Sequence, residues 1–476
     1  MACLPYRSEM SECNKEEKGG GAYANCSKMG TENEEGFSRV LLGNGLTLNE
    51  DNMETFKRLG LDIKPIINAA GPMTMYCGGS MPQEVVDAMS EVAHTTVRMD
   101  ELQAAASRVI ANITGAEAGY VTCGCAAAIT AATAACITGY DVDRINRLPD
   151  TSVMPNEILI AASQRCGYDH AMRAAGAKIV SVGMSSAPLP PGQMYQTLAE
   201  DYEVAITDRT IAIGYFYYGG GIPPLEEVVG VGKKYNIPII LDAANQVPPV
   251  ENLRKFIAMG VDLVAMSGGK GIRGPQQSGL LFGRRDLIAA AALNYFIPGC
   301  AAGYTSYDEW TPPPSLIPKE KLRGVPHEPV GRGLKVSKEA IVGLITALQI
   351  LTDEERNSRE MERLRLLLEP VVERLQGVRG VQVKMTEFLP GGFPIIIVKV
   401  DKLKLGRSAK EVLQRLKDGD PHIYVFDKLV ELTDEFIINS CSLNEEQAKI
   451  VADCLHAAFT IKDEALKEVE AEGGEK

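Results

Sequence analysis

The chain has 476 residues, of which 45% are hydrophobic and 23% charged, with a formal net charge of −13 and a pI of about 5.1. This globular composition excludes a wholly disordered chain, and the acidic balance disfavours nucleic acid as a partner. The longest apolar run, residues 126–137, is too short to span a bilayer, so no membrane insertion is expected.

The cysteines and histidines argue against a metal centre. The 11 cysteines are scattered without a C-x-x-C pair, and only five histidines are present. A zinc site needs a cluster of such ligands, so we expect no metal. Because the printed start also carries no recognisable signal peptide, we expect a protein of the reducing cytoplasm.

In chain order, residues 1–36 lack periodicity and predict a disordered leader. A large domain is expected over 37–330, where short apolar runs alternate with helical stretches. Strands are predicted at 118–121, 157–162, 178–183, 210–218, 237–241, 262–266 and 279–282. Helices are predicted at 126–137, 168–175, 225–235 and 251–259. This alternation is typical of an α/β fold with a mainly parallel sheet covered on both faces.

The pattern changes after a proline-rich stretch at 310–329. Predicted helices at 335–351, 356–375, 408–416 and 444–459 accompany predicted strands at 381–384, 395–400 and 436–439. They indicate a smaller α+β domain over 331–462, followed by a charged tail at 463–476.

Small residues stand at the start of the predicted helix 126–137. The sequence Val121-Thr122-Cys123-Gly124-Cys125-Ala126-Ala127 follows a strand and opens that helix. Free N–H groups at a helix N-terminus bind anions, so a phosphate would fit there. The pair Cys123 and Cys125 could indicate redox or metal chemistry, but without a partner cluster packing is the preferred interpretation.

A carboxylate ends the predicted strand 237–241. Asp242 is followed by Ala243 and Ala244, and open α/β sheets bind ligands at this edge. A carboxylate there can face a flat ring and keep a pyridinium nitrogen protonated. The alternative is a strand-end Asp that caps the next turn.

A lysine lies in a glycine-rich turn after the next strand, in Ser267-Gly268-Gly269-Lys270-Gly271-Ile272-Arg273-Gly274-Pro275. Its amine can reach an aldehyde with little steric obstruction, and Ser267 and Arg273 are available for a phosphate. The alternative is a solvated lysine at a surface turn.

Together these segments resemble the pyridoxal-phosphate enzymes of the aspartate aminotransferase fold, fold type I. The order is shared: a phosphate-binding helix start, a strand-end Asp, and a Lys 28 positions later. The resemblance narrows to the branch of selenocysteine synthase and D-glucosaminate-6-phosphate ammonia-lyase. It rests on INAAGPMT (67–74), VRMDELQ (97–103), TGAEAGYVTCGCAAA (114–128), the segment 242–279 and GRGLKVSKEAIVGLITAL (331–348).

The resemblance implies a role for each matching residue. Lys270 would form the Schiff base with pyridoxal 5'-phosphate and act as general base, and Asp242 would pair with the pyridinium. Ala244 would pack against the ring. The phosphate would be held by Gly124, Cys125, Ala126 and Ser267, with Arg273 close by or turned to substrate.

Two further arginines are candidates for gripping a substrate carboxylate or phosphate, namely Arg332 and Arg98. The alternative for both is a salt bridge at a domain hinge or a dimer contact. The chain departs from many relatives at the residue that stacks on the ring, where those proteins carry His. Gln164 or Arg165 takes that place, with Tyr168 and His170 further along.

The implied activity is that of a pyridoxal-phosphate-dependent lyase on a small amino acid or amino sugar acid. Abstraction of the α-proton and β-elimination would release a 2-oxo acid and ammonia. The alternatives are an amino-acid racemase or an aminotransferase. Selenium transfer to seryl-tRNA is disfavoured by the acidic charge, and a non-catalytic cofactor-binding protein by the presence of both Asp242 and Lys270. The resemblance also implies a homodimer or larger homo-oligomer.

Overall fold

The structure is a computed structural model that describes residues 53–183, 196–217, 223–295, 306–388 and 392–461. The predicted leader 1–36 and tail 463–476 lie outside the described residues. Contacts divide the chain into two compact units. The first includes the described residues 53–65, 418–421 and 461, and the second comprises 66–417 and 422–460. The expected division into a large and a small domain near residue 331 stays a prediction.

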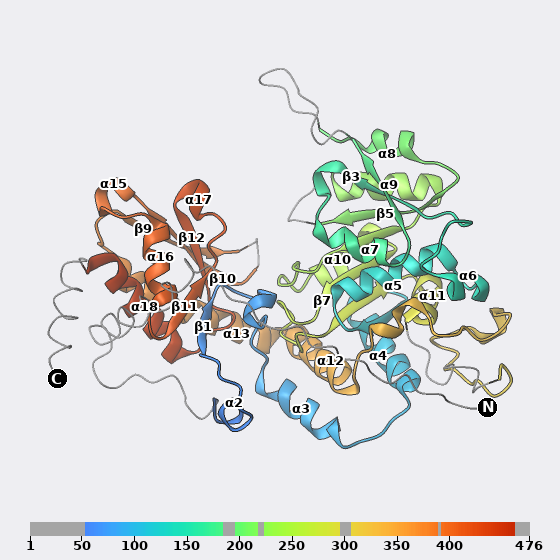
Figure 1. Cartoon of the computed structure of the whole chain (residues 1–476), viewed down its shortest axis with the longest axis horizontal. Coiled ribbons are helices and arrows are strands. Elements are labelled where there is room, and N and C mark those ends of the chain that lie inside the picture. Colours follow the sequence, from blue (N-terminus) through green and yellow to red (C-terminus); the bar gives the residue numbers. More distant parts are fainter. Residues whose placement is uncertain (1–52, 184–195, 218–222, 296–305, 389–391, 462–476) are drawn as a thin grey trace, which may run out of the picture. The chain divides into compact units, whose positions relative to one another are not determined.

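A seven-stranded sheet organises the first half of the second unit (Figure 1). Its order is β2-β8-β7-β6-β5-β3-β4. Only β8 runs antiparallel to its neighbours; the other strands are parallel to one another. The strands are β2 (Ala118–Thr122), β3 (Glu157–Ala161), β4 (Lys178–Val182), β5 (Thr210–Phe216), β6 (Ile239–Asp242), β7 (Leu263–Ser267) and β8 (Gly279–Gly283). The predicted α/β fold with a mainly parallel sheet is confirmed.

Alternate side chains of these strands enter two separate cores, because successive residues of a strand point to opposite faces. Leu241 and Val264 join one core, whereas Ile240 and Leu263 join the other. Helices α3 (Gln83–Ala93), α4 (Met99–Thr114), α9 (Leu225–Tyr235), α10 (Asn252–Met259) and α12 (Lys338–Thr352) contribute to the first core. Helices α5 (Cys125–Thr138), α6 (Val142–Arg147), α7 (His170–Ala174) and α11 (Arg285–Tyr295) contribute to the second.

A three-stranded antiparallel sheet, ordered β12-β10-β9, follows later in the chain. Its strands are β9 (Val381–Glu387), β10 (Pro394–Val400) and β12 (Glu435–Asn439), drawn in orange and red in Figure 1. A separate parallel pair joins β1 (Ile66–Ala69) to β11 (His422–Val425). The remaining helices are α2 (Glu54–Arg58), α8 (Ala199–Ala205), α13 (Glu354–Leu366), α14 (Glu369–Leu375), α15 (Lys402–Leu405), α16 (Ala409–Asp418), α17 (Val430–Thr433) and α18 (Glu445–Thr460).

The prediction of one helix over 356–375 is wrong in one respect, because the structure has two helices there. Helix α13 ends at Leu366 and α14 begins at Glu369, with Pro370 in its first turn. A proline lacks the N–H that a continuing helix would need, but it is well suited to a first turn. The helix therefore breaks and restarts at this point. No helix of the described segments is long and apolar enough to cross a membrane.

Candidate functional site

The three segments singled out in the sequence lie side by side at one edge of the seven-stranded sheet. Strand register pairs Thr122 with Gly279 and Gly279 with Ser267. On the next strand, Asp242 is opposite Ala265. The helix start, the strand-end carboxylate and the lysine turn are thereby brought together where parallel strands end, the edge at which open sheets bind ligands.

Asp242 is a buried carboxylate with polar partners. Its Oδ1 accepts a hydrogen bond from the Ala244 amide at 2.9 Å, and the Cys125 thiol lies 3.6 Å from the same oxygen. Burial raises the pKa of Asp242, against the opposing effects of the Ala244 amide and the Lys270 ammonium. A carboxylate kept away from water in this way gains from a cationic partner.

Cys125 connects the helix start to both catalytic candidates. Burial raises the pKa of its thiol well above the usual value, the Asp242 charge raises it further, and the Lys270 ammonium opposes the rise. The thiol is therefore a neutral hydrogen-bond donor to Asp242 at ordinary pH. The preference for packing over redox or metal chemistry at Cys123 and Cys125 stays a prediction.

The turn that carries Lys270 is built from glycines because other backbone segments approach it closely. A Cβ on Gly271 would stand 1.6 Å from the carbonyl oxygen of Val247, and one on Gly79 would stand 2.7 Å from that of Lys270. The Gly79 amide also donates to the Gly269 carbonyl at 2.9 Å. These contacts hold the backbone of a half-buried Lys270 in place.

Helix α5 begins without a side-chain cap. Its N-cap is Gly124, at a φ of 144°, and no side chain bonds the first turn. A Cβ on Gly279 would stand 2.7 Å from the Cys125 nitrogen, so a glycine is needed for β8 to approach the helix start. Ser267 ends β7 in the same row of residues. The uncapped amides of this 14-residue helix suit an anion, and the assignment of the phosphate to Gly124, Cys125, Ala126 and Ser267 stays a prediction.

The two candidates for stacking on the ring differ in the structure. Gln164 is buried, and its Oε1 accepts from the Phe216 amide at 3.2 Å. Its Nε2 is buried without a hydrogen-bond partner among the described residues. Arg165 instead pairs with Asp169 at 2.7 Å and bonds Ser181. Gln164 lies close enough to Tyr215 to lower the pKa of its hydroxyl, against the burial that raises it to about 12, whereas Arg165 is held by Asp169 and Ser181.

The three arginines have protein partners, and all three assignments stay predictions. Arg273, at a φ of 60°, forms an ion pair with Glu360 and donates to the Ser80 carbonyl at 2.7 Å. Arg332 pairs with Glu328 at 2.6 Å. Arg98 pairs with Asp100 at 2.8 Å and donates to the carbonyl of Thr311.

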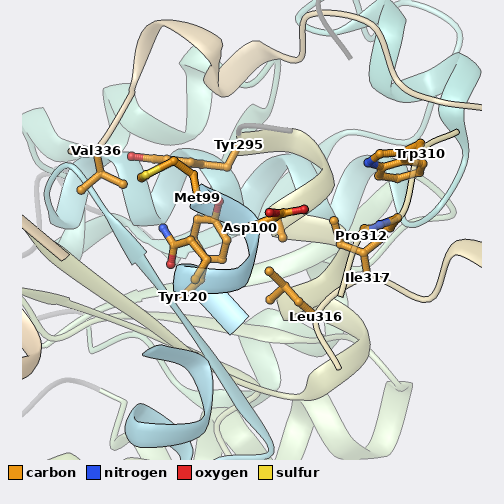
Figure 2. A pocket seen from close by; sticks show the side chains of 11 residues that line it. Met99, Asp100, Tyr120, Tyr295, Trp310, Pro312, Leu316, Ile317 and Val336 are labelled. Atoms are coloured by element: carbon orange, nitrogen blue, oxygen red, sulfur yellow. The ribbon is translucent and has the colours of Figure 1, made fainter. Parts of the chain in front are cut away.

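The segment after Arg98 lines a small cavity of about 10 Å³, room for about one water molecule (Figure 2). Trp310 and Pro312, from the proline-rich stretch 310–329, contribute to its wall together with Met99 and Asp100. Trp310 is buried there. This part of the stretch 310–329 therefore packs against α4.

A much larger pocket, of about 350 Å³, has Lys270 in its wall. That volume suits a small-molecule substrate. Thr74 and Asn245 in its wall belong to the motifs 67–74 and 242–279, but sequence reasoning missed the residues that come from later in the chain: Phe388, Phe393, Phe426, Lys428 and Asn439. The run Phe426-Asp427-Lys428 directly after a short apolar strand was the available signal.

Pyridoxal phosphate presents an aldehyde, a ring nitrogen and a phosphate, and these residues fit it. Lys270 offers an amine, Asp242 a buried carboxylate, and α5 an uncapped N-terminus. No cluster of His, Cys, Asp and Glu able to hold a metal occurs in the described part of the chain.

The fold and the site together define the class of protein: the chain is a pyridoxal-phosphate enzyme of fold type I. Residues 81–296 match the model of the family SelA, L-seryl-tRNA selenium transferase. A solved structure of D-glucosaminate-6-phosphate ammonia-lyase superposes with a TM-score of 0.64 at 25% identity, covering 90% of this chain and 100% of that one.

Three relatives are also similar to this chain in sequence over most of its length. D-glucosaminate-6-phosphate ammonia lyase of Salmonella typhimurium is 29% identical over 378 residues, 78% of this chain and 88% of that protein. The 5'-C-glycyluridine monooxygenase-decarboxylase of Streptomyces sp is 29% identical over 377 residues, 77% and 83% of the two chains. The L-seryl-tRNA(Sec) selenium transferase of Geotalea daltonii is 21% identical over 447 residues, 85% of each.

Proposed function

We propose that this enzyme is a lyase that acts on a small amino acid or amino sugar acid and releases a 2-oxo acid and ammonia. The observation that carries the proposal is the placement of Lys270 in the wall of a substrate-sized pocket, within electrostatic reach of the buried Asp242. Similarity to an ammonia lyase over most of both chains supports elimination as the outcome.

The cofactor supplies an electron-withdrawing ring that stabilises negative charge at the substrate α-carbon. Asp242 would hold the proton of the ring nitrogen, and the Cys125 thiol and Ala244 amide keep that carboxylate in position. The Lys270 amine would hold the aldehyde carbon and serve as the general base for the α-proton of the substrate. The uncapped N-terminus of α5 would hold the phosphate.

The Streptomyces relative favours a second candidate, because its identity to this chain is equally high. Its name describes a monooxygenase-decarboxylase, so oxidative decarboxylation of an amino acid is the alternative reaction. The two reactions differ in their products. Elimination releases ammonia without consuming oxygen, whereas the alternative consumes oxygen and releases carbon dioxide.

The test is to incubate the purified holoenzyme with D-glucosaminate 6-phosphate and with D- and L-amino acids that carry a leaving group at Cβ. We expect ammonia and 2-oxo acid in equal amounts, without oxygen uptake, and none of either from Lys270→Ala. Oxygen uptake with carbon dioxide would favour the second candidate. Inversion of configuration without ammonia release would contradict both and indicate a racemase. Three further properties remain predictions. Gel filtration tests the homodimer, filter binding tests the absence of tRNA binding, and cell fractionation tests the cytoplasmic location.

A further inference from the structure

The charge of the pocket beside Lys270 indicates what kind of substrate enters it. Among the described residues in its wall, only Lys270 and Lys428 are charged, and both are cationic. Lys270 is committed to the chemistry in the function proposed above, on which this inference rests. Lys428 therefore supplies the lasting positive charge of the pocket.

Lys428 is available to a ligand. No carboxylate of the described residues lies within ion-pair distance of its ammonium. Its Nζ lies 6.0 Å from the centre of the Phe426 ring, and that ring packs edge-on against Phe388 with centroids 6.3 Å apart. An ammonium beside aromatic rings, without a counter-ion, is suited to an anionic group of a substrate.

Asn439 provides a second polar contact in the same pocket. The side chain is buried, and its Oδ1 accepts from the Cys441 amide at 2.9 Å, which fixes the orientation of the amide group. Its Nδ2 lies beside Gly71, where a Cβ would stand only 3.0 Å away. A side chain at position 71 would therefore crowd this donor, and Asn439 lines the pocket.

The two polar groups lie at opposite ends of the aromatic wall. Phe426 and Ile437 form an antiparallel bridge with mutual hydrogen bonds of 2.9 Å. Lys428 lies two residues beyond Phe426, and Asn439 two residues beyond Ile437. Because the strands run in opposite directions, their backbones are separated by a distance on the order of 10 Å.

Contacts place the Asn439 end nearer to the lysine turn. Asn68 Nδ2 donates to the carbonyls of Gly71 and Gly78, and the neighbouring Gly79 bonds the Gly269 carbonyl. The loop beside Asn439 is thus the loop that packs against Lys270. Lys428 stands at the far end.

We infer that the substrate is an amino acid with a second anionic group, a phosphate or carboxylate, at its distal end. Its α-carboxylate lies toward Asn439, its distal anion is held by Lys428, and the carbon chain between them rests on Phe388, Phe393 and Phe426. Lys428 is the residue that selects substrates with the distal charge.

The test compares the binding of D-glucosaminate 6-phosphate with that of D-glucosaminate, which differ only in the distal phosphate. Dissociation constants are measured on the holoenzyme from the change in its visible absorption, which does not require turnover. For Lys428→Met we expect binding of the phosphate to weaken about 10-fold and binding of the unphosphorylated compound to change less than about 2-fold. Lys428→Arg should retain the preference for the phosphate.

Lys410→Met is the matched control, because it removes an exposed lysine that pairs with Glu431 outside the pocket. It should leave both dissociation constants unchanged. Equal weakening of both compounds by Lys428→Met, or no weakening of either, would overturn the inference. Ammonia release measured in the same samples separates the two proposals: selective binding without ammonia overturns only the lyase function, and ammonia without selectivity overturns only the role of Lys428.

Discussion

The thiol of Cys125 lies 3.6 Å from the Oδ1 atom of Asp242, and both side chains come from segments that the sheet register brings to one edge. A neutral donor at this position favours the charged form of the carboxylate without adding a positive charge. The contact links the phosphate-binding helix start to the group that acts on the ring nitrogen. It makes Cys125 a positioning residue for Asp242.

Removal of this donor should weaken cofactor binding. For Cys125→Ala we expect the dissociation constant of pyridoxal phosphate to rise roughly 10-fold, because a hydrogen bond to a charged group is lost. Cys125→Ser retains a donor and should bind nearly as the wild type does. Fluorescence titration of the apoenzyme gives both constants, and a pH titration of the visible band reports the effect on Asp242. Identical behaviour of the Ala and Ser variants would rule out a hydrogen-bonding role.

Cys125 should also resist alkylation. Burial and the Asp242 charge raise its thiol pKa well above the usual value, so the reactive thiolate stays scarce even at pH 9. The exposed Cys77 provides the internal comparison. Iodoacetamide labelling followed by peptide mass spectrometry should modify Cys77 at least about 10-fold faster than Cys125. Faster labelling of Cys125 would contradict the environment described for it.

The charge on Asp242 should cost stability in the apoenzyme. Burial raises its pKa, so the folded chain holds this proton more tightly than the unfolded chain does. The contribution of Asp242 to stability is therefore fully present below its unfolded pKa, and it is lost as pH rises through the folded pKa.

We accordingly expect apo Asp242→Asn to melt at a higher temperature than apo wild type at pH 8, with the difference shrinking toward pH 4. The holoenzyme should show the reverse order, since the cofactor provides the cation that the carboxylate lacks. Calorimetry of the four samples at both pH values measures this. A lower melting temperature for apo Asp242→Asn than for apo wild type at pH 8 would show that the buried charge of Asp242 does not destabilise the apoenzyme.

The lysine turn should not tolerate a larger residue at position 271. A methyl group there meets the Val247 carbonyl oxygen at 1.6 Å, so Gly271→Ala should destabilise the protein by about 1–3 kcal/mol and disturb Lys270. Gly230→Ala is the matched control, because no atom lies within 4 Å of its added Cβ on helix α9. That control should be neutral or stabilising by about 0.5–1 kcal/mol. Urea unfolding measures both, and equal stabilities would contradict the packing argument.

The central part of the site was predictable because its residues follow strands that share an edge. The small residues after β2, Asp242 at the end of β6 and Lys270 after β7 each belong to or follow a readable strand, and parallel strands bring their carboxyl ends together. The apolar runs of β3, β6, β7 and β8 were readable because strands buried on both faces are almost continuously hydrophobic.

Interactions between segments distant in the chain were not predictable. The partner of Arg273 is Glu360, 87 residues further on, and nothing local to either residue indicates the pairing. The pairing of β1 with β11 joins residues from opposite ends of the described chain. The pocket wall that contains Lys428 and Asn439 likewise depends on how β11 and β12 come together. The Arg332–Glu328 pair, by contrast, is separated by four residues and could have been noticed.

Reduction of the holoenzyme with borohydride tests the central claim most directly. The reagent fixes the cofactor to whichever lysine holds it, and peptide mass spectrometry then identifies that residue. The proposed site predicts one pyridoxyl group per chain, on Lys270, and loss of the visible absorption in Lys270→Ala before reduction. A stoichiometric label on any other lysine, or an unlabelled and colourless protein after incubation with pyridoxal phosphate, would contradict it.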